Sequence, residues 1–336
     1  MRLGLIGRAD DGGLGNLLAE FARHLRPDRV VIMDLGEFGR SAVHLDRYEG
    51  LDYRVCHGTA LDLDSMDWLL DGCDVLYTAE TSYNDALWSR AREKGVVTVL
   101  HAMPELFSPP HKPDVLWLPT HWEQSRFSGI AHEIVPVPIA MDRFTKTKRK
   151  SCRTFVHVGA PAMRDRNGTE IVLGALKHVQ HPCKVVMRGL AFNLVGPEGV
   201  VEIECCSGYP DDYWDIWPPD ADVLLLPRRY AGLSLPMQEA LAQGIPIISL
   251  DLEPQRSWPG VMTIPTQGRP QRAAMAGGQF EIHDGSALNL AVAMDVLMAD
   301  DGRVAELSKA ALDYAWSISW ERQLDGYRSR FEALAP

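Results

Sequence analysis

The apolar and polar positions in the first half of the chain follow a single rhythm. Short runs rich in β-branched residues alternate with stretches whose apolar residues recur at helical spacing. Strands are expected at residues 2–6, 29–35, 74–80, 96–102, 114–120 and 133–139, and helices at 15–25, 65–73 and 84–95. This alternation predicts a parallel β-sheet covered by helices on both faces.

The rhythm breaks at residues 143–153, a polar and basic segment, and then restarts. Further strands are expected at residues 154–159, 183–189, 200–206, 221–227 and 245–251, and helices at 168–179, 211–217 and 236–244. A chain of 336 residues is long enough for two ordinary α/β domains. The fold class is therefore predicted as α/β, with Rossmann-like domains at 1–145 and 154–316 and a linker at 146–153.

The last segment, residues 317–336, is predicted to be a helix. Its apolar residues recur at intervals of four and three, so they share one helical face. These residues are Trp320, Leu324, Tyr327, Phe331 and Leu334. Spacing alone leaves open what that face packs against.

A net charge of −11 disfavours two classes of protein, those that bind nucleic acid and those that bind membrane surfaces. A protein that binds nucleic acid mainly by neutralising phosphates is usually basic, and an acidic balance also weakens a membrane-surface role. The one basic run, Lys146–Lys150, is interpreted as a solvated linker. The sequence shows no signal peptide, no long apolar span and no C-x-x-C pair among its six cysteines. Buried thiols in a soluble, cytoplasmic protein are therefore expected.

A glycine-rich loop, Gly7–Asn16, follows the first predicted strand. Gly13 to Leu18 give G-x-G-x-x-L and Asp34 ends the next strand, which is the arrangement of a dinucleotide fingerprint. In that interpretation the protein is an NAD(P)-dependent oxidoreductase. Two details count against it: the third glycine is missing, and the glycines come late after the strand, whereas the dinucleotide turn is tight.

Residues 228–251 (RRYAGLSLPMQEALAQGIPIISLD) combine a strand end, a turn and a helix start. Gly232 permits a tight turn, and Pro236 suits the first turn of a helix. Free amides at a helix start can hold a diphosphate without a metal ion. Glu239, one turn further on, can accept hydrogen bonds from ribose hydroxyls. Ordinary strand–loop–helix packing with an exposed Glu239 is the alternative that this segment alone leaves open.

The same segment resembles the donor-site signature of retaining GT-B glycosyltransferases, especially glycosyltransferase family 4. That pattern is roughly P-S-x-Y-E-G-F-G-L-P-x-x-E-A-M-A-x-G-x-P-V-V. The matches in register are Pro227, Tyr230, Gly232, Leu235, Pro236, Glu239, Ala240, Ala242, Gly244 and Pro246.

Three other segments resemble the family in order and spacing, so the resemblance covers nearly the whole chain. Residues 118–144 resemble the segment that closes the first domain, through Pro119, Trp122, Phe127, Val135, Pro136, Asp142 and Phe144. Residues 155–176 resemble the start of the second domain, and residues 316–327 resemble the closing segment, whose helix crosses back to the first domain. The opening GGLG fits as the glycine loop that faces donor and acceptor.

Two residues depart from the family pattern. Ala231 replaces the first Glu of the E-x7-E pair, which usually contacts a sugar hydroxyl, and Ala160 replaces an arginine after V-G. The usual lysine falls near Arg166, with Arg164 close by, so one of these is expected to supply the cationic contact. The departures raise another alternative, a non-catalytic sugar-nucleotide-binding or interaction protein.

The resemblance implies a GT-B fold: two Rossmann-like domains with a facing cleft and a C-terminal helix that returns to the first. It implies transfer of a sugar, with retention, from a nucleoside-diphosphate sugar of the UDP or GDP type to an acceptor hydroxyl. No cofactor and no metal ion are expected. The expected donor-binding residues are Gly13, Gly15, Arg164, Arg166, Arg188, Tyr230, Gly232, Ser234, Leu235 and Glu239. The expected catalytic residues are His101, Glu105 and Asp11.

The acceptor is left open between a glycan, a lipid, a protein hydroxyl and a modified DNA base. A homodimer is also left open. Small one-chain relatives of this kind occur in bacteria and their phages, and the chain is expected to have such an origin.

Overall fold

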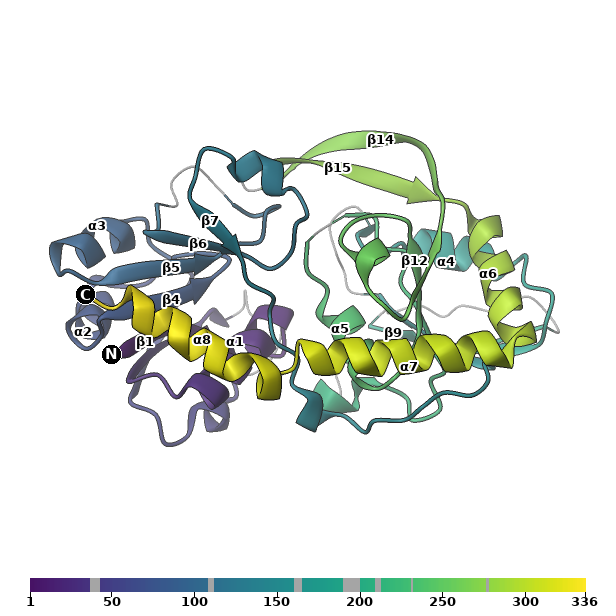
Figure 1. Cartoon of the computed structure of the whole chain (residues 1–336), viewed down its shortest axis with the longest axis horizontal. Coiled ribbons are helices and arrows are strands. Elements are labelled where there is room, and N and C mark those ends of the chain that lie inside the picture. The colour runs from purple at the N-terminus through teal and green to yellow at the C-terminus, as the bar shows by residue number, and fades with distance from the viewer. Residues whose placement is uncertain are drawn as a thin grey trace. The chain divides into compact units, whose positions relative to one another are not determined.

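The computed structural model of the chain describes residues 1–36, 43–107, 112–159, 165–189, 200–208, 213–230, 232–275 and 278–336. The chain divides into two compact units, each built on one parallel sheet (Figure 1). The first unit comprises Met1–Val137, Ala274–Gly278 and Trp320–Pro336, and the second comprises Pro138–Ala273 and Gln279–Ser319. The domain boundaries given by the sequence, including the linker at 146–153, stay predictions.

The first unit contains a seven-stranded sheet in the order β3-β2-β1-β4-β5-β6-β7, with every neighbouring pair parallel. Its strands are β1 Leu3–Arg8, β2 Arg29–Asp34, β3 Tyr53–His57, β4 Val75–Ala79, β5 Val97–His101, β6 Val115–Leu118 and β7 His132–Ile134. Its first helices are α1 Gly13–Leu25, α2 Leu63–Asp71 and α3 Ala86–Glu93, with 3₁₀ turns at Leu45–Tyr48 and Gln124–Phe127. Because helices cover the sheet, its central strands are apolar on both faces.

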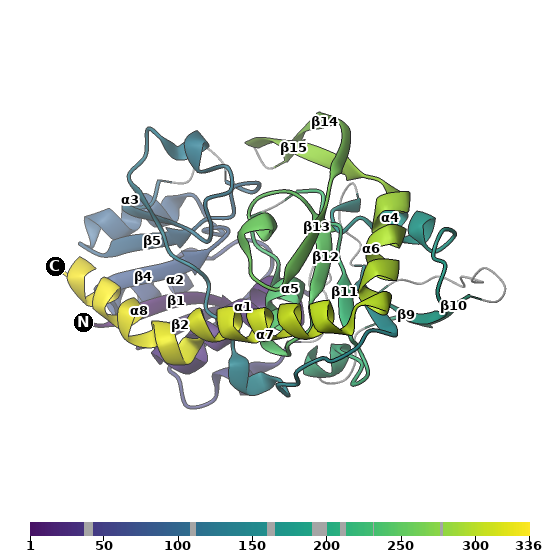
Figure 2. The same cartoon turned by 45° about the vertical axis from the view of Figure 1, so that its right-hand side comes forward.

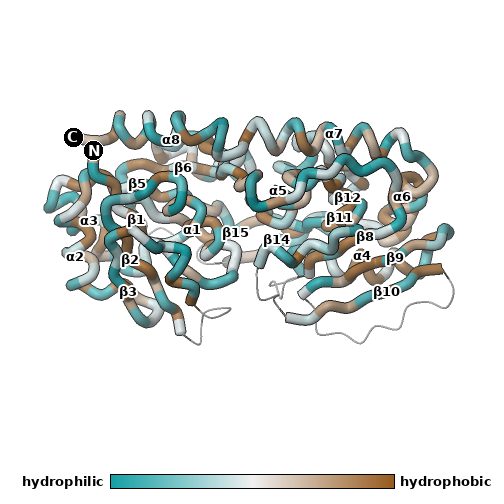
Figure 3. Tube along the Cα trace, turned by 90° about the horizontal axis from the view of Figure 1, so that it is seen from below, coloured by the Kyte–Doolittle hydropathy of each residue, from teal (hydrophilic) through white to brown (hydrophobic). Residues whose placement is uncertain are grey.

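Helix α8, Trp320–Leu334, belongs to the first unit although it ends the chain. Its buried residues are Trp320, Tyr327 and Phe331, three of the five predicted for the apolar face. The Trp320 ring packs edge-on against Phe21 of α1 at 4.9 Å between centroids. Apolar positions, brown in Figure 3, recur between teal ones along this helix. The predicted return of the C-terminal helix to the first domain is confirmed.

The second unit contains a six-stranded parallel sheet in the order β10-β9-β8-β11-β12-β13. Its strands are β8 Thr154–Val158, β9 Cys183–Arg188, β10 Val201–Cys206, β11 Val223–Leu225, β12 Ile247–Leu250 and β13 Val261–Ile264. Its helices are α4 Thr169–Ala175, α5 Leu235–Ala242, α6 Ala287–Ala299 and α7 Asp301–Ser317, with 3₁₀ turns at Met141–Arg143, Tyr213–Ile216 and Gln255–Ser257.

Successive residues of the second sheet face two different cores, as the strand period of two requires. Phe155 and Val223 lie in a core with residues of α4 and α6. Their neighbours Val156 and Leu224 lie in the other core, with residues of α5 and α7. This covering of both faces is the architecture that the apolar runs predict.

A hairpin of β14, Thr266–Met275, and β15, Gly278–Gly285, follows the second sheet (Figure 2). The sequence analysis expects no strand in either segment. Only a few of its side chains are buried, among them Ala273, Phe280 and Ile282. Residues 266–272 of β14 are all exposed and include no aliphatic or aromatic side chain, so β14 carries little of the alternation that marks a strand, whereas residues 279–283 of β15 do alternate.

Strand order reverses once in each sheet, between β1 and β4 in the first unit and between β8 and β11 in the second. Ligands of open α/β sheets bind beyond the carboxyl ends of the strands at such a point. A ligand is therefore expected at the loops that follow β1 and β4 in the first unit, or at those that follow β8 and β11 in the second.

Candidate functional site

The loop between β11 and α5 places a helix start beside the switch point of the second sheet. Ser234 is the residue before α5, and its extended backbone (φ −140°, ψ 99°) opens the first turn. Its side chain does not cap the helix. The Ser234 Oγ is buried and has no hydrogen-bond partner within the part of the chain that the structure describes. A buried hydroxyl beside the amides of a first helical turn is suited to an anionic ligand.

Glu239 lies one turn into α5 and is only 6% exposed. Its Oε1 accepts a hydrogen bond from the Tyr213 hydroxyl at 2.8 Å, and its Oε2 accepts one from Trp217 Nε1 at 3.2 Å. Burial raises the pKa of Glu239 to about 7, although both hydrogen bonds act in the opposite direction. Each carboxylate oxygen keeps a second lone pair, so Glu239 can also accept from a ligand hydroxyl.

Arg166 lies over an aromatic face on the same edge of this sheet. Its guanidinium carbon lies 5.3 Å from the ring centroid of Tyr230, a cation–π arrangement that orients the side chain. The backbone nitrogen of Arg229 donates to the Arg166 carbonyl at 2.9 Å. The loops after β8 and β11 are thereby joined, which brings the predicted donor residues Arg166 and Tyr230 together.

Gly168 is a second point at which the loop after β8 approaches the loop after β11 closely. It has a positive φ of 70°, and a Cβ there would stand 2.3 Å from the Pro227 carbonyl oxygen. Only glycine fits such an approach of two backbones without displacement. The predicted donor residue Gly232 is buried in the loop that continues from Pro227.

The hairpin supports this loop through ring and backbone contacts. The Phe280 ring lies 4.8 Å from the Tyr230 ring. The His283 backbone nitrogen donates to the Arg229 carbonyl at 3.1 Å, and Arg229 Nε donates back to the His283 carbonyl at 2.9 Å. Sequence reasoning missed Phe280 and His283, although the alternation of polar and apolar residues from Gln279 to His283 is a strand signal that could have found them.

Among the described residues, Arg166, Arg188, Arg228 and Arg229 lie at this edge of the sheet, and two of them have structural roles. Arg228 is buried and donates through Nη2 to the Leu233 carbonyl, which fixes the loop before α5. Arg229 is bonded to the hairpin as described. Arg166 and Arg188 remain half-exposed, with Arg188 at the carboxyl end of β9. They are therefore the arginines best placed to meet a ligand anion.

Three residues that the sequence singles out, Arg164, Ala160 and Ala231, lie outside the described residues. The expected choice between Arg164 and Arg166 therefore stays a prediction.

In the first unit, α1 begins at Gly13, directly after the loop that ends β1. The Gly12 backbone nitrogen donates to Asp10 Oδ1 at 2.7 Å, and no side chain caps the helix. A Cβ on Gly15 would stand 2.0 Å from the Asp10 carbonyl oxygen. Gly15 is therefore explained by close packing of the helix on its own loop, while Gly13 is exposed at the first turn.

Asp11, predicted to face an acceptor, is buried and bonded to an arginine and a histidine side chain. Its Oδ1 accepts from Arg47 Nη2 at 2.5 Å, and its Oδ2 lies 3.0 Å from His44 Nε2. Neither His44 nor Arg47 is a sequence-predicted site residue, because their contacts with Asp11 span more than thirty positions.

His101, predicted to act at the sugar, is fully buried among aromatic rings of the first unit. Its Nδ1 lies 3.0 Å from the Tyr77 hydroxyl, and its ring meets Trp117 edge-on. Burial lowers the pKa of His101 to about 3, so the ring is neutral. This is the setting of a structural histidine, and the predicted role of His101 at the sugar stays a prediction. Glu105, the other candidate near β5, is also buried.

Within the described residues, no group of three or more His, Cys, Asp or Glu side chains could hold a metal ion. The same residues include no helix long and apolar enough to span a membrane.

Comparison with solved structures gives full-length similarity to GT-B glycosyltransferases. Anabaena HepE, solved in complex with UDP, has a TM-score of 0.72 at 13% identity and covers 99% of this chain and 100% of its own. Sucrose-phosphate synthase from Thermosynechococcus elongatus has a TM-score of 0.67 at 13% identity, with 99% and 100% covered. The lipopolysaccharide outer core galactosyltransferase WaaB has a TM-score of 0.65 at 14% identity, with 99% of both chains covered. No family model and no curated protein matches the sequence significantly.

These similarities establish the fold, since their sequence identity is low. The chain has the GT-B fold, which confirms the predicted fold class, while the assignment to family 4 and the retention of configuration stay predictions. The HepE structure holds UDP, a nucleoside diphosphate of the kind predicted for the second unit here.

Proposed function

We propose that the protein is a glycosyltransferase that moves a sugar from a nucleoside-diphosphate sugar, of the UDP or GDP type, to an acceptor hydroxyl. One observation carries the proposal: the buried Ser234 hydroxyl, which has no hydrogen-bond partner among the described residues, immediately precedes α5 and lies five positions before the buried Glu239. The start of α5 suits the diphosphate of the donor, and the Glu239 carboxylate suits the ribose next to it.

Donor binding is assigned to the carboxyl edge of the second sheet. The α5 amides, the Ser234 hydroxyl and the half-exposed Arg166 and Arg188 bind the diphosphate oxygens. Glu239 accepts from a ribose hydroxyl while Tyr213 and Trp217 hold its carboxylate in place. The predicted donor roles of Tyr230, Gly232, Leu235, Gly13 and Gly15, and of Arg164, are kept as part of the proposal.

The reaction breaks the bond between the anomeric carbon and the diphosphate, and the electron pair leaves with the nucleoside diphosphate. Fixed cations and helix amides stabilise that charge best when they are already in place before bond breaking. Arg166 on the Tyr230 face is a fixed cation of this kind. We propose that these groups replace a metal ion, and that the anomeric configuration is retained, as the family resemblance implies.

The oxidoreductase alternative is not favoured. Asp34, which would hold the ribose of a dinucleotide, is instead hydrogen-bonded to His57 Nδ1 and to the Gly36 nitrogen, both at 2.9 Å. Helix α1 also begins five positions after β1 ends, at Gly13 against Arg8, which is too late for a tight dinucleotide turn.

A thermal-shift panel of UDP, GDP, their sugars and NAD tests the proposed donor class. Stabilisation by one diphosphate nucleotide or its sugar supports the proposal, and stabilisation by NAD alone contradicts it. Incubation of the best donor with glycan, lipid, peptide and modified-DNA acceptors, followed by mass spectrometry, then identifies the acceptor class. The predicted cytoplasmic location, bacterial or phage origin and homodimer are separate proposals that this panel does not address.

A further inference from the structure

Glu239 is a buried acid without a neighbouring cation. It lies within α5, is only 6% exposed, and forms no ion pair within the part of the chain that the structure describes. Its two hydrogen bonds come from neutral donors, the Tyr213 hydroxyl at 2.8 Å and Trp217 Nε1 at 3.2 Å. Burying an ionised carboxylate without a cation is unfavourable, so this environment favours the protonated acid.

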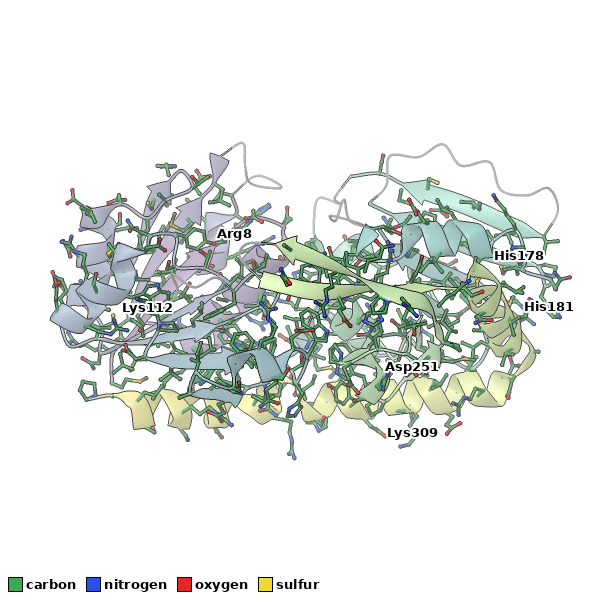
Figure 4. All side chains as sticks on the ribbon, turned by 90° about the horizontal axis from the view of Figure 1, so that it is seen from above. Arg8, Lys112, His178, His181, Asp251 and Lys309 are labelled. Atoms are coloured by element: carbon green, nitrogen blue, oxygen red, sulfur yellow. The ribbon has the colours of Figure 1, made fainter. Side chains whose placement is uncertain are left out.

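The charged groups on the elements next to α5 have other partners or face solvent. On the 3₁₀ turn Tyr213–Ile216, Asp215 is exposed. In the loop before α5, Arg228 donates to a backbone carbonyl of the same loop. Asp251, labelled in Figure 4, follows β12 and lies 3.2 Å from Arg256 Nε. None of these groups is a cause of the raised pKa of Glu239.

Helix α7 shares an apolar core with α5, and its charged side chains are exposed. Its Asp313 accepts from Lys309, which is also labelled in Figure 4. Tyr314 stays neutral near pH 7, because burial raises its pKa to about 12. Burial is therefore the main cause that raises the pKa of Glu239 to about 7, while the two hydrogen bonds lower it.

A ribose hydroxyl changes the balance between the acid and the carboxylate. Hydroxyl donors stabilise the ionised form of a carboxyl group. Each oxygen of Glu239 accepts one hydrogen bond in this structure and can accept a second. A nucleoside that donates to Glu239 therefore lowers its pKa, and by linkage the carboxylate binds that nucleoside more tightly than the acid does.

We propose that donor binding is coupled to the release of a proton from Glu239, so that acid weakens the binding of the nucleotide sugar; this inference rests on the proposed function. The carboxyl O–H bond of Glu239 breaks and its proton passes to solvent. Hydrogen bonds from the ribose to the carboxylate form in its place, and no other covalent bond changes. The affinity for the donor is thereby sensitive to pH near neutrality.

Titration calorimetry with UDP-glucose and GDP-mannose, in buffers of different ionisation enthalpy, measures this coupling. Each phosphate of these probes carries a nucleoside or a sugar, so neither phosphate titrates near neutral pH. At about pH 6.5 the wild type should release between about 0.5 and 1 proton for each nucleotide sugar bound. Its affinity should rise roughly tenfold from about pH 6 to about pH 8.

Three variants separate the role of Glu239 from other titrating groups. Glu239→Gln cannot ionise, so it should bind without proton release and with nearly the same affinity across this pH range. Tyr213→Phe keeps the carboxyl group but removes one donor, so the pKa of Glu239 should rise and the increase in affinity should move to higher pH. Glu306→Gln, at an exposed site in the same unit, should behave as the wild type.

Should Glu239→Gln fail to fold or to bind, infrared difference spectra of the wild type and Tyr213→Phe supply the decision. Loss of a protonated-carboxyl band on addition of the nucleotide sugar supports the inference, and an unchanged band overturns it.

The remaining outcomes separate the inference from the proposed function. Binding of a nucleotide sugar without proton release, or release that persists unchanged in Glu239→Gln, overturns the inference and leaves the proposed function standing. Failure of the wild type to bind any UDP or GDP sugar overturns the proposed function, and the inference with it.

Discussion

Replacing Glu239 with glutamine tests the buried carboxyl on which donor binding is proposed to depend. Glutamine keeps the shape of the side chain but cannot ionise. Its amide accepts through one atom only, so either Tyr213 or Trp217 loses its acceptor. That loss costs about 1–3 kcal/mol at every pH. The ionisation of Glu239, by contrast, affects stability in a pH-dependent way that the variant removes.

The sign and size of that pH dependence follow from the raised pKa. The pKa of Glu239 is about 7 in the folded protein against an ordinary value of 4.5. Its contribution to stability is therefore fully present below the ordinary value and is lost as the pH rises through 7. The loss from about pH 5 to about pH 8 is roughly 2–3 kcal/mol in the wild type.

Urea unfolding of the wild type and of Glu239→Gln at these two pH values measures the effect. The stability of the variant relative to the wild type should increase by roughly 2–3 kcal/mol on going from the lower to the higher pH. Glu306→Gln, an exposed change in the same unit, should show little pH dependence. A relative stability of Glu239→Gln that is the same at both pH values would refute a raised pKa for this carboxyl.

Three further substitutions are each compared with a control variant. Arg166→Ala should weaken UDP binding by about 1.5–3 kcal/mol in titration calorimetry because it removes a charged hydrogen-bond donor, while Arg256→Ala on the same unit should not; equal affinities would remove Arg166 from the diphosphate site. Phe280→Ala should weaken UDP binding more than Phe280→Leu does, and no difference would show that the hairpin does not support the site. Trp320→Ala should destabilise the first unit by about 3–5 kcal/mol in urea unfolding; Trp316→Ala, at an exposed site, should change it little, and equal effects would contradict the docking of α8.

The architecture was predictable because parallel strands covered on both faces appear as continuous apolar runs. Helix α5 was predictable for another reason: glycine, proline and glutamate stand at fixed positions around its start. The face of α8 followed from spacing, but its receiving partners, such as Phe21, come from the opposite end of the chain.

Side-chain surroundings were harder to predict, since they depend on contacts distant in sequence. His101 ends a strand, yet its ring turns into the core beside Tyr77, 24 positions away. Glu239 was expected at the site, but its donors Tyr213 and Trp217, and so its raised pKa, lie on a separate turn. The His44–Asp11 pair spans 33 positions and leaves no local motif.

Hydrogen–deuterium exchange with and without UDP tests the central claim most directly, namely that a nucleoside diphosphate binds at the carboxyl edge of the second sheet. Backbone amides of residues 226–242 should exchange more slowly with UDP, because the ligand holds the start of α5, and NAD should have no such effect. Unchanged exchange in that segment at saturating UDP, or protection by NAD around Gly13 and Asp34, would contradict the proposal.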